Sequence, residues 1–164
     1  MLLLALACVV TSEDTALDTD APAALPLDAA FPAQLTDRYA CGINWYVAYD
    51  AARTIRLQAG FTTPHGEDPG QSNEGPLGGE VATLQVYQGT CLMTPGCTDD
   101  IDTEGCGEQV IAHRYDATAG VMTLAADDAG VAGEVTGLAL EGTDGEDPVS
   151  LATLDLPHAD FWVE

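Results

Sequence analysis

Residues 54–61 read TIRLQAGF, and apolar side chains occupy every second position of this segment from Ile55 to Phe61. A period of two is typical of a β-strand that buries one face and exposes the other. The same period occurs over residues 81–87, where the alternating apolar positions run from Ala82 to Val86. Both segments are therefore predicted to be strands of an all-β domain.

Further short apolar segments follow one another along the chain. They cover residues 43–49, 109–115, 121–126, 135–141 and 151–156, with a short final segment at 161–163. Residues of types that favour turns separate them, at 50–52, 116–120, 127–130 and 142–145. About seven to eight short strands at this spacing predict an antiparallel β-sandwich.

An apolar run over residues 2–7 ends in small residues directly before Cys8. The pattern resembles the bacterial lipobox, in which the signal peptide is removed and the cysteine becomes a lipid-bearing first residue. The run is shorter than the about 20 apolar residues that span a bilayer, and it lacks the basic start of a signal peptide. We expect residues 1–7 to be a signal peptide with a start codon placed too late, and Cys8 to carry palmitate. The alternative is a fragment in which Cys8 lies in an ordinary buried run.

Residues 8–36 form an acidic segment that contains many Ala and Pro residues. Five carboxylates and no cation fall between Thr11 and Asp28. Such a segment buries too little apolar surface to offset the entropy lost on ordering. We predict a disordered tether over residues 8–36 and one folded domain over residues 37–164. Val9 follows the lipobox cysteine, and by resemblance to the common sorting rule this favours the outer membrane, on its periplasmic or its outer face.

The chain carries a formal net charge of −23, with four arginines, no lysine and 27 acidic residues. Nucleic-acid binding requires a positive surface that neutralises phosphates, so this class of function is excluded. Direct electrostatic adhesion to anionic lipid is disfavoured for the same reason. Mutual repulsion among the carboxylates costs stability, and salt screens it.

Four cysteines remain once Cys8 is set aside, which is an even number in an exported chain, so disulfides are expected. One arrangement joins Cys91 to Cys106 at the mouth of a long hairpin loop and Cys41 to Cys97. A second arrangement, Cys91–Cys97 with Cys41–Cys106, stays open. A zinc site is the competing interpretation, but the spacings lack the paired Cys-x-x-Cys of structural zinc motifs.

The acidic segment between these cysteines contains a partial calcium-loop pattern. Asp100, Asp102 and Glu104, followed by Gly105, match the first, third, fifth and sixth positions of such a loop. Position twelve is Ile111, where a bidentate Glu is required. Calcium at Asp100, Asp102 and Glu104 is therefore a weak candidate, and no other cofactor is expected.

Support for catalysis is thin. No serine lies in a Gly-x-Ser-x-Gly setting, and the three histidines are scattered singly. Of these, His65 lies in a Gly/Pro-rich loop over residues 62–79, whereas His113 falls on a predicted strand and His158 in a turn. The aromatic residues are a possible carbohydrate-stacking face, although aromatics on strands are more often core. They are Trp45, Tyr46, Tyr49, Tyr87 and Trp162.

The segments 41–45, 53–57, 88–90 and 97–100 together resemble a group of uncharacterised secreted lipoproteins of the kind abundant in myxobacteria and marine relatives. The resemblance covers most of the chain from Cys41 onward and rests on short motifs. It implies an exported location, a small disulfide-bonded β domain and a bridge between Cys41 and Cys97. Cys91 and Cys106 would then be this chain's additional pair. The group has no established activity, so the resemblance implies no reaction.

We therefore expect a lipid-anchored, exported β-sandwich with a non-enzymatic structural or binding role at the bacterial cell envelope. Its expected partners are the membrane, through the lipid, and an envelope protein or polysaccharide, and the chain is expected to be monomeric. The first alternative is a calcium-dependent adhesion or carbohydrate- or protein-recognition module. The second alternative is a secreted hydrolase.

Overall fold

The computed structural model describes residue 27 and residues 31–62, 70–92, 108–143 and 145–161. Within these ranges the chain is built from strands, with two short 3₁₀ turns, η1 (Phe31–Gln34) and η2 (Gly42–Asn44). The strands are β1 (Leu35–Ala40), β2 (Trp45–Asp50), β3 (Ile55–Phe61), β4 (Ser72–Pro76), β5 (Ala82–Thr90), β6 (Val110–Ala126), β7 (Gly130–Gly142) and β8 (Val149–Phe161). The prediction of an all-β chain is confirmed.

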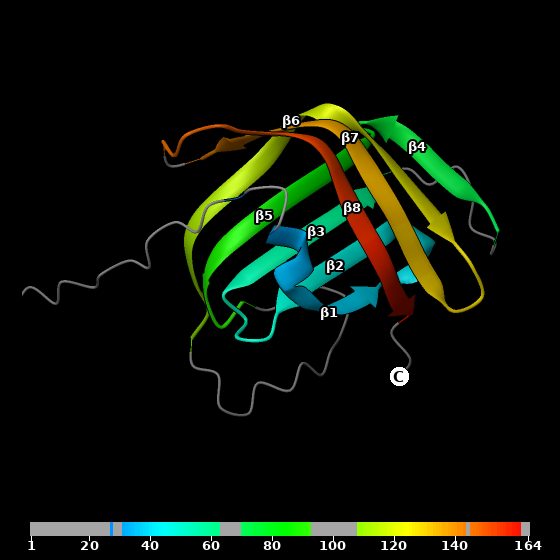
Figure 1. Cartoon of the computed structure of the whole chain (residues 1–164), viewed down its shortest axis with the longest axis horizontal. Coiled ribbons are helices and arrows are strands. Elements are labelled where there is room, and N and C mark those ends of the chain that lie inside the picture. The colour runs from blue at the N-terminus through cyan, green and yellow to red at the C-terminus, as the bar shows by residue number, and fades with distance from the viewer. Residues whose placement is uncertain (1–26, 28–30, 63–69, 93–107, 144, 162–164) are drawn as a thin grey trace, which may run out of the picture.

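The strands form one sheet that closes on itself. Hydrogen-bonded neighbours follow the order β6-β5-β3-β2-β1-β8-β7, and β7 pairs again with β6, so that seven strands make a barrel (Figure 1). Among the described strands, the short strand β4 pairs with β6 alone and lies outside this ring. The predicted β-sandwich is therefore wrong.

Two pairings produce the closure. The first and last strands of the barrel run parallel, with Tyr39 opposite Asp160 and Ala40 opposite Phe161. Strands β6 and β7 pair antiparallel from Tyr115 to Ala126. A sandwich and a barrel both bury alternate residues of every strand, so the period of two does not distinguish between them.

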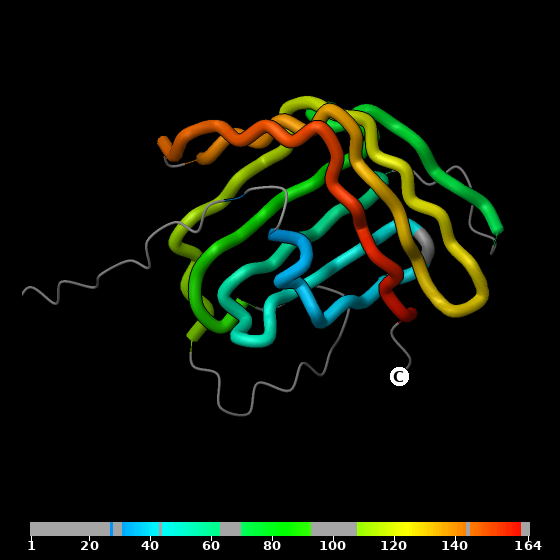
Figure 2. The backbone as a smooth tube through the Cα atoms, in the orientation of Figure 1, coloured from blue at the N-terminus to red at the C-terminus, as the bar shows by residue number. Residues whose placement is uncertain are grey.

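Strand β6 continues through residues 116–120, where the sequence predicted a turn. The register of β6 against β7 shifts twice in this stretch, and Gly120 adopts a φ of 131° that favours glycine. These irregularities bend the strand without ending it, as the trace in Figure 2 shows. The first part of β6 pairs with β5 and the second part with β4.

Two strands were not predicted. One is β1, which lies in the stretch directly before Cys41. The other is β4, which lies inside the Gly/Pro-rich region 62–79 and shows alternating burial despite its low hydrophobicity. Both strands are short, so their sequences carry little periodic signal.

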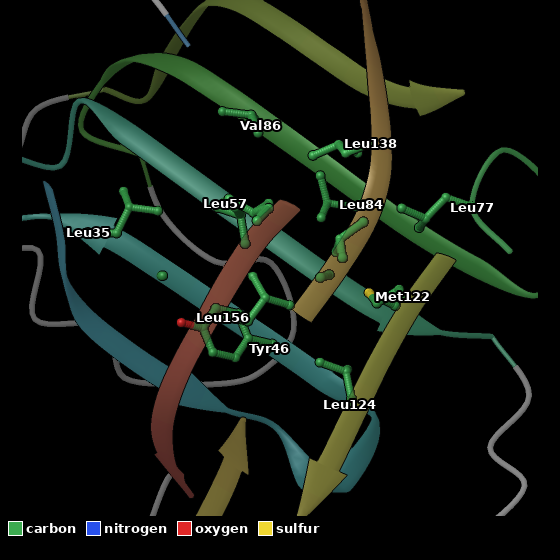
Figure 3. Close-up of a cluster of buried hydrophobic side chains, with 14 of the residues drawn as sticks. Leu35, Tyr46, Leu57, Leu77, Leu84, Val86, Met122, Leu124, Leu138 and Leu156 are labelled. Atoms are coloured by element: carbon green, nitrogen blue, oxygen red, sulfur yellow. The ribbon is translucent and has the colours of Figure 1, made fainter. Parts of the chain in front are cut away.

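The barrel interior is filled with large side chains, most of them aliphatic. Figure 3 shows Leu57, Leu84, Met122 and Leu156 converging from different strands of the barrel. A barrel of this size has an interior that side chains can fill completely. The buried set begins upstream of residue 37, since Leu27, Phe31 and Leu35 are part of the same core.

A second, smaller cluster lies on the outside of the barrel. Val47, Tyr49, Tyr87 and Leu92 are buried there, and Tyr39 and Trp45 pack against them. Every residue of β3 is consequently buried, including those that point outward. The expectation that this strand exposes one face is wrong, and its polar residues Arg56 and Gln58 are enclosed.

Candidate functional site

Arginine and tyrosine side chains stack in pairs on the outside of strands β2, β3 and β5 and of the turn between β2 and β3. The Arg56 guanidinium lies 4.0 Å from the centroid of the Tyr87 ring, and Arg53 lies 4.1 Å from that of Tyr49. Arg53 also forms an ion pair with Asp37 at 3.7 Å. We call Tyr49, Arg53, Arg56 and Tyr87 the arginine–tyrosine layer. Cation–π contacts of this kind strengthen when the cation is shielded from water, as Arg56 is at 2% exposure.

The layer continues into a chain of side-chain hydrogen bonds. Gln58 donates to the amide oxygen of Gln85 at 2.6 Å, and the Tyr87 hydroxyl donates to the same oxygen at 2.7 Å. Gln85 in turn donates to Oδ1 of Asp116 at 2.8 Å. Arg114 completes the chain, because its Nε and Nη2 both donate to that oxygen, at 3.0 and 2.9 Å. The polar network (Gln58, Gln85, Tyr87, Arg114 and Asp116) thus runs from the buried layer to the surface.

A pocket opens where this network reaches solvent. Its volume is about 280 Å³, and it lies between the outer faces of β5 and β6 and the connection from β4 to β5. The side chains of Arg114 and Asp116 are 42% and 34% exposed, so both meet water at the pocket. The lining residues are Gly78, Gly79, Ala82, Thr83, Leu84, Gln85, Arg114, Asp116, Ala117 and Thr118.

Glycine forms one wall of the pocket. A Cβ atom on Gly78 would overlap the carbonyl of Thr118, and Gly78 adopts a φ of 83°. Only glycine lets the β4–β5 connection approach β6 this closely without strain. Gly79 differs, since a Cβ atom there would meet open space.

Burial sets the electrostatics of the two most enclosed tyrosines. It raises the pKa of Tyr49, in the arginine–tyrosine layer, to about 12, although Arg56 and Arg53 oppose the shift. Burial likewise raises the pKa of Tyr46, inside the barrel, to about 12 against the opposing charge of Arg38. Both hydroxyls therefore stay protonated at neutral pH and offer no nucleophile.

A separate polar cluster lies where β6 begins and β7 ends. Nδ1 of His113 lies 2.7 Å from a carboxylate oxygen of Glu146, and both side chains are largely buried. Burial, with Glu146 and Asp147 adding to it, raises the pKa of the neighbouring Tyr115. His113 thus links the β7–β8 connection to β6.

His158 lies at the surface between two carboxylates. Its ring nitrogens are 3.4 Å from Asp127 and 3.4 Å from Asp160. Asp127 accepts hydrogen bonds from the backbone N–H groups of Ala129 and Gly130, which lower its pKa together with His158. This arrangement stabilises the β6–β7 turn.

Several of the residues that the sequence singled out lie outside the described ranges. These are Cys8, His65, Cys97, Asp100, Asp102, Glu104, Cys106 and Trp162. Cys41 and Cys91 are described, and both are disulfide-bonded. The choice of partner between Cys97 and Cys106 stays a prediction, as do the lipid on Cys8 and the calcium loop.

The aromatic residues of this set that the structure describes do not form an exposed stacking face. Tyr46, Tyr49 and Tyr87 are buried at 7% exposure or less, and Trp45 is half-buried against its neighbours. They belong to the two buried clusters, as aromatic residues on strands more often do.

Across the described part of the chain, no three His, Cys, Asp or Glu side chains are grouped closely enough to hold a metal ion. The same residues include no helix long and apolar enough to cross a membrane. No protein-family model, curated protein or solved structure matches the chain.

Sequence reasoning missed the pocket and its two charged residues. The sequence pattern puts Arg114 on a strand and indicates no role for it, and it predicts that Asp116 lies in a turn. Their spacing of two residues was the available signal, since residues i and i+2 of one strand share a face. The signal was hidden because residues 116–120 resemble a turn in composition.

Proposed function

We propose that the protein is a non-enzymatic binding module of the bacterial cell envelope, held by lipid on Cys8, and that it binds its ligand in the pocket between β5 and β6. The observation that carries this proposal is the Arg114–Asp116 pair, held at 2.9 Å and open to solvent in a pocket of about 280 Å³. Large side chains fill the barrel interior, which leaves the outer surface as the place for a ligand.

The buried side of the network supports a binding role. Asp116 takes hydrogen bonds from Gln85 and Arg114, and the Tyr87 hydroxyl bonds to Gln85 behind them. Side chains fixed in this way lose little conformational freedom when a ligand arrives, and this lowers the cost of binding.

The acidic composition supports attachment by lipid. A chain with a net charge of −23 is repelled by anionic lipid head groups, so its own surface gives no electrostatic hold on a membrane. The lipobox-like residues before Cys8 and the resemblance to secreted lipoproteins supply an anchor of another kind. Anchoring that is stable requires more than one acyl chain, as bacterial lipoproteins carry.

Cell fractionation with labelled palmitate tests the anchor. The full chain is expected to take up label and to enter the membrane fraction, whereas Cys8→Ala should be unlabelled and released. Ser12→Ala is the matched control and should behave as the parent chain. A Cys8→Ala protein that stays in the membrane fraction would contradict the anchor.

Sedimentation with isolated envelope fragments tests the pocket. The released Cys8→Ala chain should sediment with the fragments. Adding Thr83→Trp places a large side chain in the pocket and should abolish sedimentation with the fragments. Thr153→Trp is the control: it lies at an exposed position of β8 away from the pocket, and this variant should sediment as before. Equal sedimentation of the two tryptophan variants would show that the pocket is not the binding site.

A further inference from the structure

The charges that line the pocket cancel. The Arg114 guanidinium and the Asp116 carboxylate form a close ion pair, and among the residues that the structure describes no other charged residue lines the pocket. The chain around this pair is strongly acidic. An anionic ligand would therefore meet repulsion at long range without a free cation to bind, whereas a neutral ligand meets no such penalty.

The ion pair leaves bonding capacity on both partners. Three donors converge on Oδ1 of Asp116, and within the described residues none reaches Oδ2. Arg114 uses Nε and Nη2, and its Nη1 has no acceptor among those residues. An acceptor and a donor therefore remain available on neighbouring side chains that meet solvent.

Two adjacent hydroxyl groups match this arrangement. A hydroxyl both donates and accepts, so one can donate to Asp116 while its neighbour accepts from Arg114. Thr83 and Thr118 line the same pocket and are exposed, and their hydroxyls can bond in either direction. An apolar ligand would leave all these groups unsatisfied, and this costs binding free energy.

We propose that the pocket binds neutral saccharides, with two adjacent hydroxyls held by Arg114 and Asp116. This inference rests on the proposed binding function and names its ligand class. The volume, about 280 Å³, lies just below the about 300–1,000 Å³ found for small-molecule sites. The pocket therefore accepts one sugar ring of a chain, and the rest of the polysaccharide stays outside.

Titration of the full chain, with Cys8→Ala to release it, tests the ligand class by amide NMR shifts. The probes are the methyl glycosides of mannose, glucose, galactose and N-acetylglucosamine at millimolar concentration. Glucuronate, which is anionic, and cyclohexanol, which has a single hydroxyl, are the comparison compounds. At least one glycoside should shift the amides of Gly79, Thr83 and Thr118. Glucuronate should bind about fivefold more weakly at low salt, and cyclohexanol should not bind.

Substitution separates specific from incidental binding. Asp116→Asn keeps the shape but replaces one acceptor by a donor, so it should weaken glycoside binding roughly tenfold or more. Asp155→Asn, at an exposed position of β8, removes the same charge elsewhere and should leave binding unchanged. Circular dichroism checks that both variants are folded.

Three results would overturn the ligand class: no shift with any glycoside, equal binding by Asp116→Asn, or equal binding of glucuronate or cyclohexanol. If envelope sedimentation still depended on Thr83, the pocket would bind another kind of ligand and the proposed function would stand. If glycosides bound but the chain carried no lipid and did not sediment with envelope fragments, the proposed function would be wrong. The inference that the pocket binds saccharides would still stand.

Discussion

Trp45 on β2 covers Gly60 on β3, its direct cross-strand partner, on the outside of the barrel. A Cβ atom on Gly60 would overlap the six-membered ring of the indole, so the tryptophan occupies the space that a side chain would fill. Aromatic side chains compensate strand glycines in this way, because they shield the exposed backbone and supply packing area.

Replacing Gly60 by alanine should therefore displace the indole. We expect Gly60→Ala to lower the free energy of unfolding by about 1–3 kcal/mol, as overpacking does, and to change the tryptophan fluorescence. Urea unfolding and emission spectra measure both effects. Gly79→Ala is the control, because its Cβ meets open space, and its stability should change by less than about 0.5 kcal/mol. Equal stability of the two variants would contradict the packing described.

The Tyr87 ring and its hydroxyl have separable roles. The ring lies against Arg56, whereas the hydroxyl donates to Gln85 at 2.7 Å. Tyr87→Phe keeps the ring but loses the bond to Gln85 and the longer bond from Gln58 at 3.4 Å, so it should cost about 1 kcal/mol. Tyr87→Leu also removes the ring beneath a buried guanidinium and should cost about 2–4 kcal/mol.

Denaturant unfolding of both Tyr87 variants provides the measurement. An equal loss in the two variants would mean that the contact with Arg56 adds nothing to stability. A loss of stability in Tyr87→Leu alone would instead mean that the hydrogen bonds of the hydroxyl add no stability to the folded state. The hydroxyl would then bond equally well to water in the unfolded state.

Alkaline pH should destabilise the protein through Tyr46 and Tyr49. Their folded pKa of about 12 lies above the unfolded value of 10.0, so the native state holds its protons where the unfolded state has lost them. The stabilisation is complete below pH 10 and is lost as the pH rises towards 12, by about 2–3 kcal/mol for each residue.

Urea unfolding between pH 9 and 12 measures this loss of stability. Absorbance at 295 nm follows tyrosine ionisation, which should occur at a higher pH in the folded than in the unfolded protein. The double variant Tyr46→Phe/Tyr49→Phe removes both groups, so its stability should fall less steeply over the same range. If the stability of the double variant fell with pH as steeply as that of the parent chain, the loss would not come from Tyr46 and Tyr49.

The strands were predicted where a period of two combined with large apolar residues, as in β3 and β5. Their inward residues, such as Leu57 and Leu84, are core residues as expected. The closure of the sheet was not predictable, because it depends on the pairing of β1 with β8, which are far apart in the sequence. Pairing of this kind leaves no local pattern.

The pocket was missed for a related physical reason. It is formed where β6 passes from β5 to β4, and the strand bends there without ending. The residues that permit the bend are small or polar, and composition alone reads such residues as a turn. Arg114 and Asp116 were therefore assigned to different elements, although they share one face of one strand.

The carboxylate of Asp50 holds the tight connection between β2 and β3. Its Oδ1 accepts from the backbone N–H groups of Thr54 and Ile55, at 2.7 and 2.6 Å, and its Oδ2 accepts from the Thr54 hydroxyl at 2.7 Å. These bonds fix the register of the two central strands, because β3 starts at Ile55. Asp50→Ala leaves two backbone donors without their acceptor and should cost about 2–3 kcal/mol.

Asp50→Asn retains one acceptor oxygen and should cost about half as much. Thr54→Val removes only the hydroxyl bond, so it isolates the side-chain contact from the two backbone contacts. Urea unfolding gives the ranking, and hydrogen exchange at the amides of Thr54 and Ile55 reports the local bonds directly. In Asp50→Ala these two amides should exchange faster, while those of β7 and β8 should follow only the global loss of stability. Unchanged exchange at both amides would show that the carboxylate does not hold this connection.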